Sequence, residues 1–371
     1  MNTLNFKLPE IIFADNFSHA ISNKVKKSNC IVFTSKYWAK NSYYKSLKKK
    51  INLLDSIENI SPSPELNQIF ETPINLKKTN YILTIGGGSV IDFTKAVLAF
   101  NAINRKKNIY KDIVFTNKEF KDLIVPKIIA VPTTSGTGSE INSWGTVWYN
   151  GDKYSVSGKD LMPTTVILDA NLCKSMPTSL TVSTALDALS HAFEAIWNKN
   201  HNPIVDELSI AAIKKIKKYL PLTIKNKSNL KYRKEMQLAS FLAGIAMSKT
   251  KTAICHSISY PLTSLYGLSH GIACSLTLSE VCKLNVKHNP QRASIISQAM
   301  GCSNMNLEGS LIKFLMNIKY GSYLKPIKDA NINNSINFIN SSRSKNSLVK
   351  ISNNDAVRMV IYSIKKFIAN Y

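Results

Sequence analysis

The sequence predicts an α/β domain built on a parallel sheet, followed by a domain made only of helices. Short, continuous apolar runs such as 30–34, 81–85 and 127–131 alternate with helical, lysine-rich stretches in the first half of the chain. This pattern is typical of parallel strands that are buried on both faces. Beyond about residue 178, strand signals become rare and helical periodicity dominates. We therefore expect two domains, over 1–177 and 178–371.

The elements can be placed in order along the chain. The expected strands are 11–13, 30–34, 81–85, 127–131 and 165–168, and a hairpin is expected over 145–157 with its turn at Asn150-Gly151. The expected helical segments are 178–198, 203–219, 230–249 and 252–289, and a last helix near 354–369. The segment 329–354 is rich in Asn and Ser and predicts loops. The cleft between the domains is where we expect a small-molecule site.

Composition favours a soluble, cytoplasmic protein. Apolar residues make up 44% of the chain and charged residues 19%, an ordinary globular balance. No apolar run reaches the ~20 residues of a membrane helix, and the N-terminus lacks the pattern of a signal peptide. The six cysteines form no C-x-x-C pair, so we expect reduced thiols rather than disulfides or a cysteine-type zinc site.

The charge balance is unusual, because 48 Lys and Arg residues face 23 Asp and Glu residues and leave a net charge of +25. Such a surplus makes a nucleic-acid-binding protein a remote alternative. Only five of the 48 are arginines, which are favoured in bidentate phosphate and base contacts. The lysines are scattered in short groups at helix-surface spacing. We therefore expect a solvated, lysine-rich surface and no nucleic-acid partner.

Glycine-rich segments directly follow two of the predicted strands. The run Gly86-Gly87-Gly88-Ser89 opens a helix, where free backbone N–H groups bind phosphate oxygens. The run 132–140, Pro-Thr-Thr-Ser-Gly-Thr-Gly-Ser-Glu, offers hydroxyls and flexible glycines at the end of another strand. Either run alone also fits a tight turn or a capped helix start. Together they favour a nucleotide site.

A carboxylate and three imidazoles lie in apolar, helical sequence. Asp187 and His191 are four residues apart and share one helix face, while His256 and His270 follow in similar surroundings. Such groups are not buried without partners. Three His and one Asp form a ligand set suited to Fe(II) or Zn(II) with one position open for substrate. Histidines satisfied within the core remain the alternative interpretation.

Taken in this order, the motifs resemble the iron-dependent (group III) alcohol dehydrogenase family over most of residues 5–290. The resemblance rests on Gly86-Gly87-Gly88-Ser89-x2-Asp92-x2-Lys95, on 132–140, on Asp187-Ala188-Leu189-x-His191-Ala192-x-Glu194 and on His256-x13-His270-Gly271. It implies a dinucleotide-binding first domain and a metal-binding second domain. The implied metal is Fe(II), with Zn(II) as an alternative, and its ligands would be Asp187, His191, His256 and His270. The implied cofactor contacts are Gly87, Gly88, Ser89, Thr133, Thr134, Thr137, Lys153 and Leu172.

The sequence departs from the family pattern at three places. Ser35 stands where the family often has an Asp that binds the adenosine ribose, and Lys36 follows it. Losing that carboxylate removes repulsion against a 2′-phosphate, so we favour NADPH, with NADH as the alternative. Tyr260 stands where some members have a histidine proposed to relay protons, so Tyr260 is a candidate relay. The segment from about 330 does not follow the common ending.

Further details resemble the phosphonoacetaldehyde reductase branch, among them Thr146-Val147-Trp148 and Cys255-His256-Ser257-Ile258-Ser259-Tyr260. The expected function is therefore the NAD(P)H-dependent reduction of a small aldehyde, here 2-phosphonoacetaldehyde to 2-hydroxyethylphosphonate, by a homodimer. A short-chain alcohol or polyol dehydrogenase of the same family is the main alternative. A synthase of the dehydroquinate type, for which we would expect Glu as the first ligand, and a metal site that has become purely structural are further alternatives.

Overall fold

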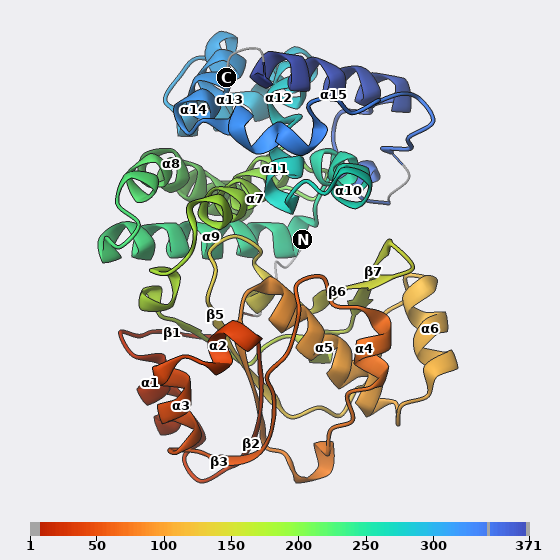
Figure 1. Cartoon of the computed structure of the whole chain (residues 1–371). Helices are drawn as coiled ribbons and strands as arrows, with labels where there is room; N and C mark the ends of the chain where they lie inside the picture. The colour runs from red at the N-terminus through yellow and green to blue at the C-terminus, as the bar shows by residue number, and fades with distance from the viewer. Residues whose placement is uncertain (1–7, 340–341, 369–371) are drawn as a thin grey trace. The chain divides into compact units, whose positions relative to one another are not determined.

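The computed structural model describes residues 8–339 and 342–368 (Figure 1). By their packing they form two compact units. The N-terminal unit contains the residues up to Thr134 together with Ser139–Cys173, and the helical unit contains Ser135–Gly138 and the residues from Lys174 onward. The short segment 135–138 therefore belongs to the helical unit, although it lies within the N-terminal part of the sequence. The domain boundary at 177/178 stays a prediction.

A six-stranded parallel sheet forms the centre of the N-terminal unit, which confirms the predicted α/β fold. The strand order is β1-β8-β5-β4-β2-β3, and every neighbouring pair is parallel. The strands are β1 (Glu10–Phe13), β2 (Asn29–Thr34), β3 (Asn52–Ile57), β4 (Tyr81–Gly86), β5 (Lys127–Pro132) and β8 (Thr165–Leu168). Strand β3 was not predicted. It is an edge strand with only half-buried or exposed residues, so it lacks the continuous apolar run of its neighbours.

Alternate residues of each central strand enter different cores, as pleating requires. In β2, Ile31 and Phe33 pack with α4 (Leu66–Phe70), α5 (Gly88–Ala102) and α6 (Lys107–Phe115). Cys30 and Val32 face the opposite core, with α1 (Phe17–Val25), α2 (Lys36–Ala39) and α3 (Ser42–Lys48). Figure 1 shows these two groups of helices on opposite faces of the sheet. Burial on both faces explains why the central strands are mostly apolar rather than alternating between apolar and polar residues.

The predicted hairpin is also present. Strands β6 (Trp144–Tyr149) and β7 (Asp152–Ser157) pair antiparallel. The turn residues Asn150 and Gly151 have φ values of 51° and 83°. Asn and Gly tolerate this left-handed conformation best, which is why the dipeptide predicts such a turn.

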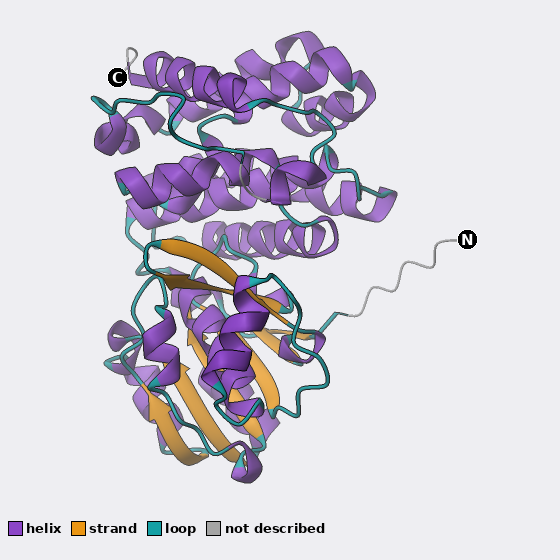
Figure 2. Cartoon of the chain, turned by 90° about the vertical axis from the view of Figure 1, so that its right-hand side faces the viewer, coloured by secondary structure: helices purple, strands orange, loops and turns teal. Residues whose placement is uncertain are grey.

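The helical unit is built around α7 (Thr178–Ile196), in which every residue from Thr181 to Ile196 is buried. A helix that is buried on all sides belongs at the centre of a core. In Figure 2 the described part of this unit contains helices and loops only. The other helices are α8 (Pro203–Lys225), α9 (Leu230–Thr250), α10 (Ile254–Tyr266), α11 (His270–Ser275), α12 (Leu278–His288), α13 (Pro290–Met300), α14 (Leu307–Asn317) and α15 (Asn353–Ile368).

The predicted helical segment 252–289 is divided into α10, α11 and α12. Gly267 ends α10 with φ of 69°, a left-handed C-terminal cap that periodicity alone does not reveal. This division places His270 at the first position of α11. Within the described residues, no helix combines the length and apolar character needed to cross a bilayer.

Candidate metal centre and nucleotide loops

Four predicted ligands meet inside the helical unit, at one oxygen of Asp187. Atom Oδ1 lies 3.5 Å from His191 Nε2, 3.4 Å from His256 Nε2 and 3.9 Å from His270 Nε2. The rings of His191 and His256 stack at 4.8 Å with an interplanar angle of 12°. The side chain of His270 is 34% exposed, whereas the other three are at most 5% exposed. We call these four residues the Asp187 cluster, and solvent reaches it from the His270 side.

Local sequence explains how three helices supply this cluster. Asp187 and His191 lie one turn apart on α7, as their spacing predicts. His270 is brought close by Gly271, because a Cβ atom at that position would lie 1.8 Å from Ser183 O and 2.9 Å from Asp187 N. Only glycine permits such a close approach of α11 to α7. The His-Gly pair therefore serves the geometry of the cluster.

Glu194 lies about one helical turn beyond His191 on α7 and holds His256 in place. Its carboxylate is fully buried. It accepts hydrogen bonds from the N–H groups of Ala253 (2.7 Å), Cys255 (2.5 Å) and His256 (3.2 Å) at the start of α10. Nδ1 of His256 lies 2.6 Å from the same carboxylate. Since a carboxylate only accepts, Nδ1 carries a hydrogen, and Nε2, which lies beside Asp187, is the ring nitrogen that can bind a metal.

Unsatisfied atoms indicate that the Asp187 cluster suits a cation. Asp187 Oδ1 and His256 Nε2 are buried and have no hydrogen-bond partner among the described atoms. Buried polar atoms without partners are rare and demand an explanation. An oxygen and several imidazole nitrogens directed at one point are the donors that Fe(II) and Zn(II) prefer. The residues present therefore fit the metal that the sequence predicts.

Electrostatics keep Asp187 and His191 in the protonation states that bind a metal. Burial lowers the pKa of His191 to about 4, so its imidazole is neutral at pH 7. Burial would raise the pKa of Asp187, but the surrounding histidines lower that pKa well below its ordinary value. For Glu194, His256 and the α10 amides outweigh burial and lower the carboxyl pKa. Burial would also lower the pKa of His256, but the acidic groups Cys274, Glu194 and Asp187 raise that pKa well above its ordinary value, so a bound metal would displace a proton from this imidazole.

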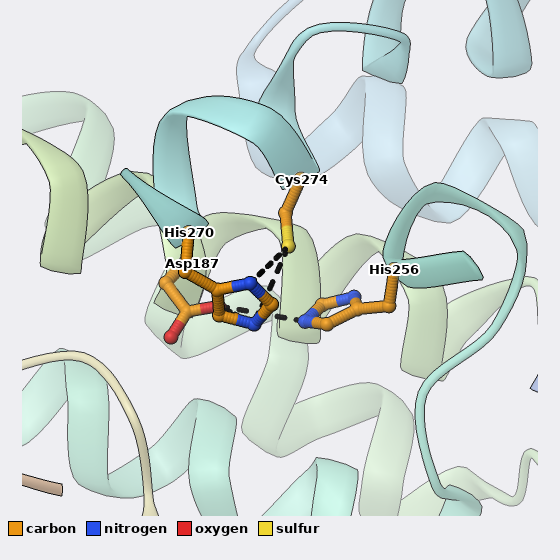
Figure 3. Close-up of side chains that lie close together, drawn as sticks. All are labelled: Asp187, His256, His270 and Cys274. Carbon is orange, nitrogen blue, oxygen red and sulfur yellow. Dashed lines mark hydrogen bonds and ion pairs between the residues drawn. The ribbon is translucent and has the colours of Figure 1, made fainter. Parts of the chain in front are cut away.

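Cys274, on α11, is a residue of this site that sequence reasoning missed. Its Sγ lies 3.7 Å from both ring nitrogens of His270. Ligand atoms of Asp187, His256, His270 and Cys274 all lie within 4.8 Å of one another (Figure 3). Its spacing of four residues from His270 was the available signal. A cysteine in apolar helical sequence is usually core, and burial does raise the pKa of this thiol.

In the N-terminal unit, the first glycine-rich segment lies beside the start of the second, residues 132–134. Strands β4 and β5 are neighbours, with Gly86 opposite Pro132, and the N–H of Thr133 donates to Gly86 O at 3.0 Å. A Cβ atom at Gly87 would lie 3.2 Å from the Thr134 side chain. Gly87 caps α5 and Gly88 is its first residue, so the helix N-terminus opens at this edge of the sheet.

A buried lysine fixes the second segment to α5. Nζ of Lys95 donates to Ser139 O at 2.6 Å, to Asn142 O and Oδ1 at 2.8 Å each, and to Trp144 O at 2.9 Å. Burial lowers the pKa of Lys95 to about 8, and it raises that of Glu140 to about 7. The Lys of the glycine-rich motif is thus a structural clamp on the neighbouring loop.

The remaining predicted site residues are distributed over both units. Ser35 follows β2 and caps α2, where Oγ accepts from Trp38 N at 3.4 Å. Lys153 is half-buried on β7, while Leu172 is 3% exposed within a core of the N-terminal unit. Tyr260, on α10, stacks its ring on that of His270 at 6.3 Å and 8°. Half-buried positions in the glycine-rich segments are Gly87, Ser89, Thr134 and Thr137, whereas Gly88 and Thr133 are buried.

Comparison with known proteins shows which family shares the sequence of both units. Residues 9–170 match the model described as iron-containing alcohol dehydrogenase, and residues 181–333 match the C-terminal model of the same family. The chain is 33% identical over 244 residues to the NAD-dependent methanol dehydrogenase of Bacillus methanolicus, covering 65% of this chain and 63% of that protein. It is 31% identical over 269 residues to the NADPH-dependent butanol dehydrogenase of Clostridium saccharobutylicum, covering 71% and 67%.

A solved structure agrees over nearly the whole length. The sulfoacetaldehyde reductase of Bifidobacterium kashiwanohense, in complex with NAD+, superposes with a TM-score of 0.86 at 26% identity and covers 98% of this chain and 99% of that one. Two family models that adjoin along the chain, together with the sequence and structural relatives, agree with the geometry of both units. The chain belongs to the iron-containing alcohol dehydrogenase family.

Proposed function

We propose that this protein is a metal-dependent NAD(P)H oxidoreductase that reduces a small aldehyde to an alcohol. The observation that carries the proposal is the convergence of three histidine nitrogens on the buried Asp187 Oδ1, at 3.4 to 3.9 Å. In the balanced reaction, hydride from NAD(P)H joins the carbonyl carbon, a proton joins the oxygen, and NAD(P)+ and an alcohol leave.

We assign separate tasks to the residues of the cluster. Asp187, His191, His256 and His270 would hold the metal, which when bound supplies a Lewis acid that polarises the carbonyl. Glu194 keeps the hydrogen of His256 on Nδ1, so that Nε2 stays a donor atom. We propose Tyr260 as a proton relay, because its ring stacks on His270 at the exposed side of the cluster.

For the cofactor, we propose that the adjoining loops at β4 and β5 bind the dinucleotide through Gly87, Gly88, Ser89, Thr133 and Thr134, with Thr137, Lys153 and Leu172 as further contacts. The N-terminus of α5 supplies N–H groups for phosphate. We favour NADPH over NADH. Ser35, directly after the neighbouring strand β2, offers no carboxylate, and Lys36 beside it is exposed.

For the substrate, we propose 2-phosphonoacetaldehyde, reduced to 2-hydroxyethylphosphonate. Support comes from the similarity to sulfoacetaldehyde reductase, whose name denotes a two-carbon aldehyde with a strongly acidic group. The similarity to methanol and butanol dehydrogenases favours the second candidate, a short-chain alcohol dehydrogenase with an uncharged substrate. The homodimer and the cytoplasmic location stay predictions, which analytical ultracentrifugation and cell fractionation test.

A substrate panel tests the proposal. The protein is loaded anaerobically with Fe(II) or with Zn(II), and each form is assayed with NADPH and NADH on phosphonoacetaldehyde, sulfoacetaldehyde, propanal and butanal. We expect turnover that a chelator abolishes and that added metal restores. Full turnover by protein shown to be metal-free would contradict the metal role, and no turnover of any aldehyde by the metal-loaded protein would overturn the proposed activity.

A further inference from the structure

The segment after the family match brings an arginine to the exposed side of the Asp187 cluster. The C-terminal family model ends at residue 333, and a short 3-10 helix, η7 (Ser342–Asn346), follows it and packs on α10. The guanidinium of Arg343 lies over the ring of Tyr260, 5.6 Å from its centroid. The Tyr260 ring is parallel to that of His270. Arg343 therefore stacks on Tyr260, and Tyr260 stacks on His270, which is a member of the cluster.

The backbone around Arg343 is held on both sides. Nη1 of Arg343 donates to Thr252 Oγ1 at 2.7 Å, and Asn346 Nδ2 donates to Thr252 O at 2.8 Å. The N–H of Lys199 donates to Asn346 O at 2.8 Å, and that of Leu348 donates to the carbonyl of the residue after α7, Trp197, at 3.1 Å. A guanidinium fixed in this way keeps its orientation at little entropic cost on binding.

His270 marks the open side of the Asp187 cluster. The exposed fraction of His270 shows where a small molecule can enter, since its side chain is 34% exposed while Asp187 is 5% exposed. Arg343 and Tyr260 thus lie at the open side of the site.

The other arginines of the chain are engaged away from the cluster. Arg292 pairs with Asp206, and Arg358 is an exposed partner of Asp355. Arg233 is buried and donates to Lys227 O, Thr181 Oγ1 and Met176 O. Arg105 belongs to the N-terminal unit and donates to Phe70 O. Arg343, by contrast, contacts Tyr260, whose ring stacks on that of His270.

We infer that Arg343 binds the anionic end of the substrate, a tetrahedral phosphonate or sulfonate, while the carbonyl lies at the Asp187 cluster. The inference rests on the proposed aldehyde reduction and makes the segment after residue 333 a determinant of specificity. The guanidinium fork matches two oxygens of such a group, which a lysine does only as a point charge. An uncharged aldehyde gains nothing from this contact.

The test compares Arg343→Gln and Arg343→Lys with Arg358→Gln, which removes the same charge at a site whose side chain is 80% exposed. Each variant is loaded with metal, its metal content is measured, and kcat/KM is determined for phosphonoacetaldehyde, sulfoacetaldehyde and propanal. For Arg343→Gln we expect a loss of about 10- to 100-fold on the preferred anionic aldehyde, the usual range for a charge-assisted contact. Propanal should change less than about 3-fold, and Arg343→Lys should be intermediate.

The binding of 2-hydroxyethylphosphonate, measured by calorimetry on the same proteins, provides a second readout that does not depend on turnover. An equal loss on propanal and on the anionic aldehydes, or no loss in Arg343→Gln, would overturn the inference and leave the proposed reduction intact. If no aldehyde is reduced by the wild-type protein, the proposed function fails, and unchanged product binding in Arg343→Gln then overturns the inference separately. A preference between the two anionic aldehydes identifies the natural group.

Discussion

Replacing Glu194 with glutamine tests how the fold prepares the cluster for a metal. The carboxylate accepts from three backbone N–H groups at the start of α10 and from Nδ1 of His256. The amide keeps one oxygen, which can still accept from Cys255 and His256. Its NH2 group then faces Ala253 N and His256 Nδ1. Nδ1 must become an acceptor, and the ring hydrogen moves to Nε2, the atom that would bind the metal.

The magnitude follows from these contacts. The N–H of Ala253 loses its acceptor, which costs about 1–3 kcal/mol for a buried donor. Loss of the carboxylate that orients a ligating histidine weakens metal affinity by about 10- to 100-fold. At about 1.4 kcal/mol per tenfold, this corresponds to about 1.4–2.8 kcal/mol. We therefore expect the variant to lose both unfolding free energy and metal affinity.

The assay is competition for Zn(II) against a chromophoric chelator, with urea unfolding of the metal-free protein alongside. Glu207→Gln is the matched control, because Glu207 is an exposed residue of the neighbouring helix α8. Its metal affinity and unfolding free energy should both stay within the error of the wild type. Wild-type metal affinity in Glu194→Gln, or the same decrease in Glu207→Gln, would refute the reasoning from hydrogen placement.

Three further predictions address other parts of the molecule. Gly271→Ala should destabilise the fold by about 1–3 kcal/mol through overpacking against Ser183 O, whereas Gly309→Ala, with open space around it, should not; urea unfolding of both decides. Ser35→Asp should shift the kcat/KM ratio toward NADH by about 5-fold, since one like-charge pair in water costs on the order of 1 kcal/mol, and an unchanged ratio would argue against a 2′-phosphate there. Burial raises the pKa of Glu140 from 4.5 to about 7, so its contribution to stability is present below pH 4.5 and is lost as pH rises through 7. Glu140→Gln should remove this slope in unfolding free energy, and an unaltered slope would contradict the assignment.

Most of the fold could be predicted because burial on both faces leaves a clear pattern. The runs at β2, β4 and β5 are almost continuously apolar, since their alternate residues enter two cores. Strand β3 has no such pattern, because an edge strand pairs through its backbone while its side chains stay half-exposed. The division of 252–289 depends on the left-handed conformation of Gly267, which a periodicity analysis averages out.

At the site, too, the sequence pattern predicts some residues and leaves out those whose position depends on three-dimensional packing. Asp187 and His256 could be predicted because a charged or imidazole side chain in an apolar helix needs a partner. Cys274 has no such requirement, since a thiol is ordinary in a core, and only three-dimensional packing brings it to His270. Arg343 lies in an Asn- and Ser-rich stretch whose sequence carries no periodicity. Its position depends on hydrogen bonds to Thr252 and to residues just after α7.

The pairing of β1 with β8 determines when the sheet can be completed during synthesis of the chain. Glu10 is opposite Thr165. Strand β1 therefore has no partner to pair with until β8, and with it most of the N-terminal unit, has left the ribosome. The short segment 135–138 belongs to the helical unit, where Gly136 packs under Thr184 and Gly138 against Gly244. A fragment that starts at residue 178 therefore lacks part of its own core. Attempts to express the two halves separately should keep residues 135–138 with the helices, and cutting the chain at a single point cannot achieve that.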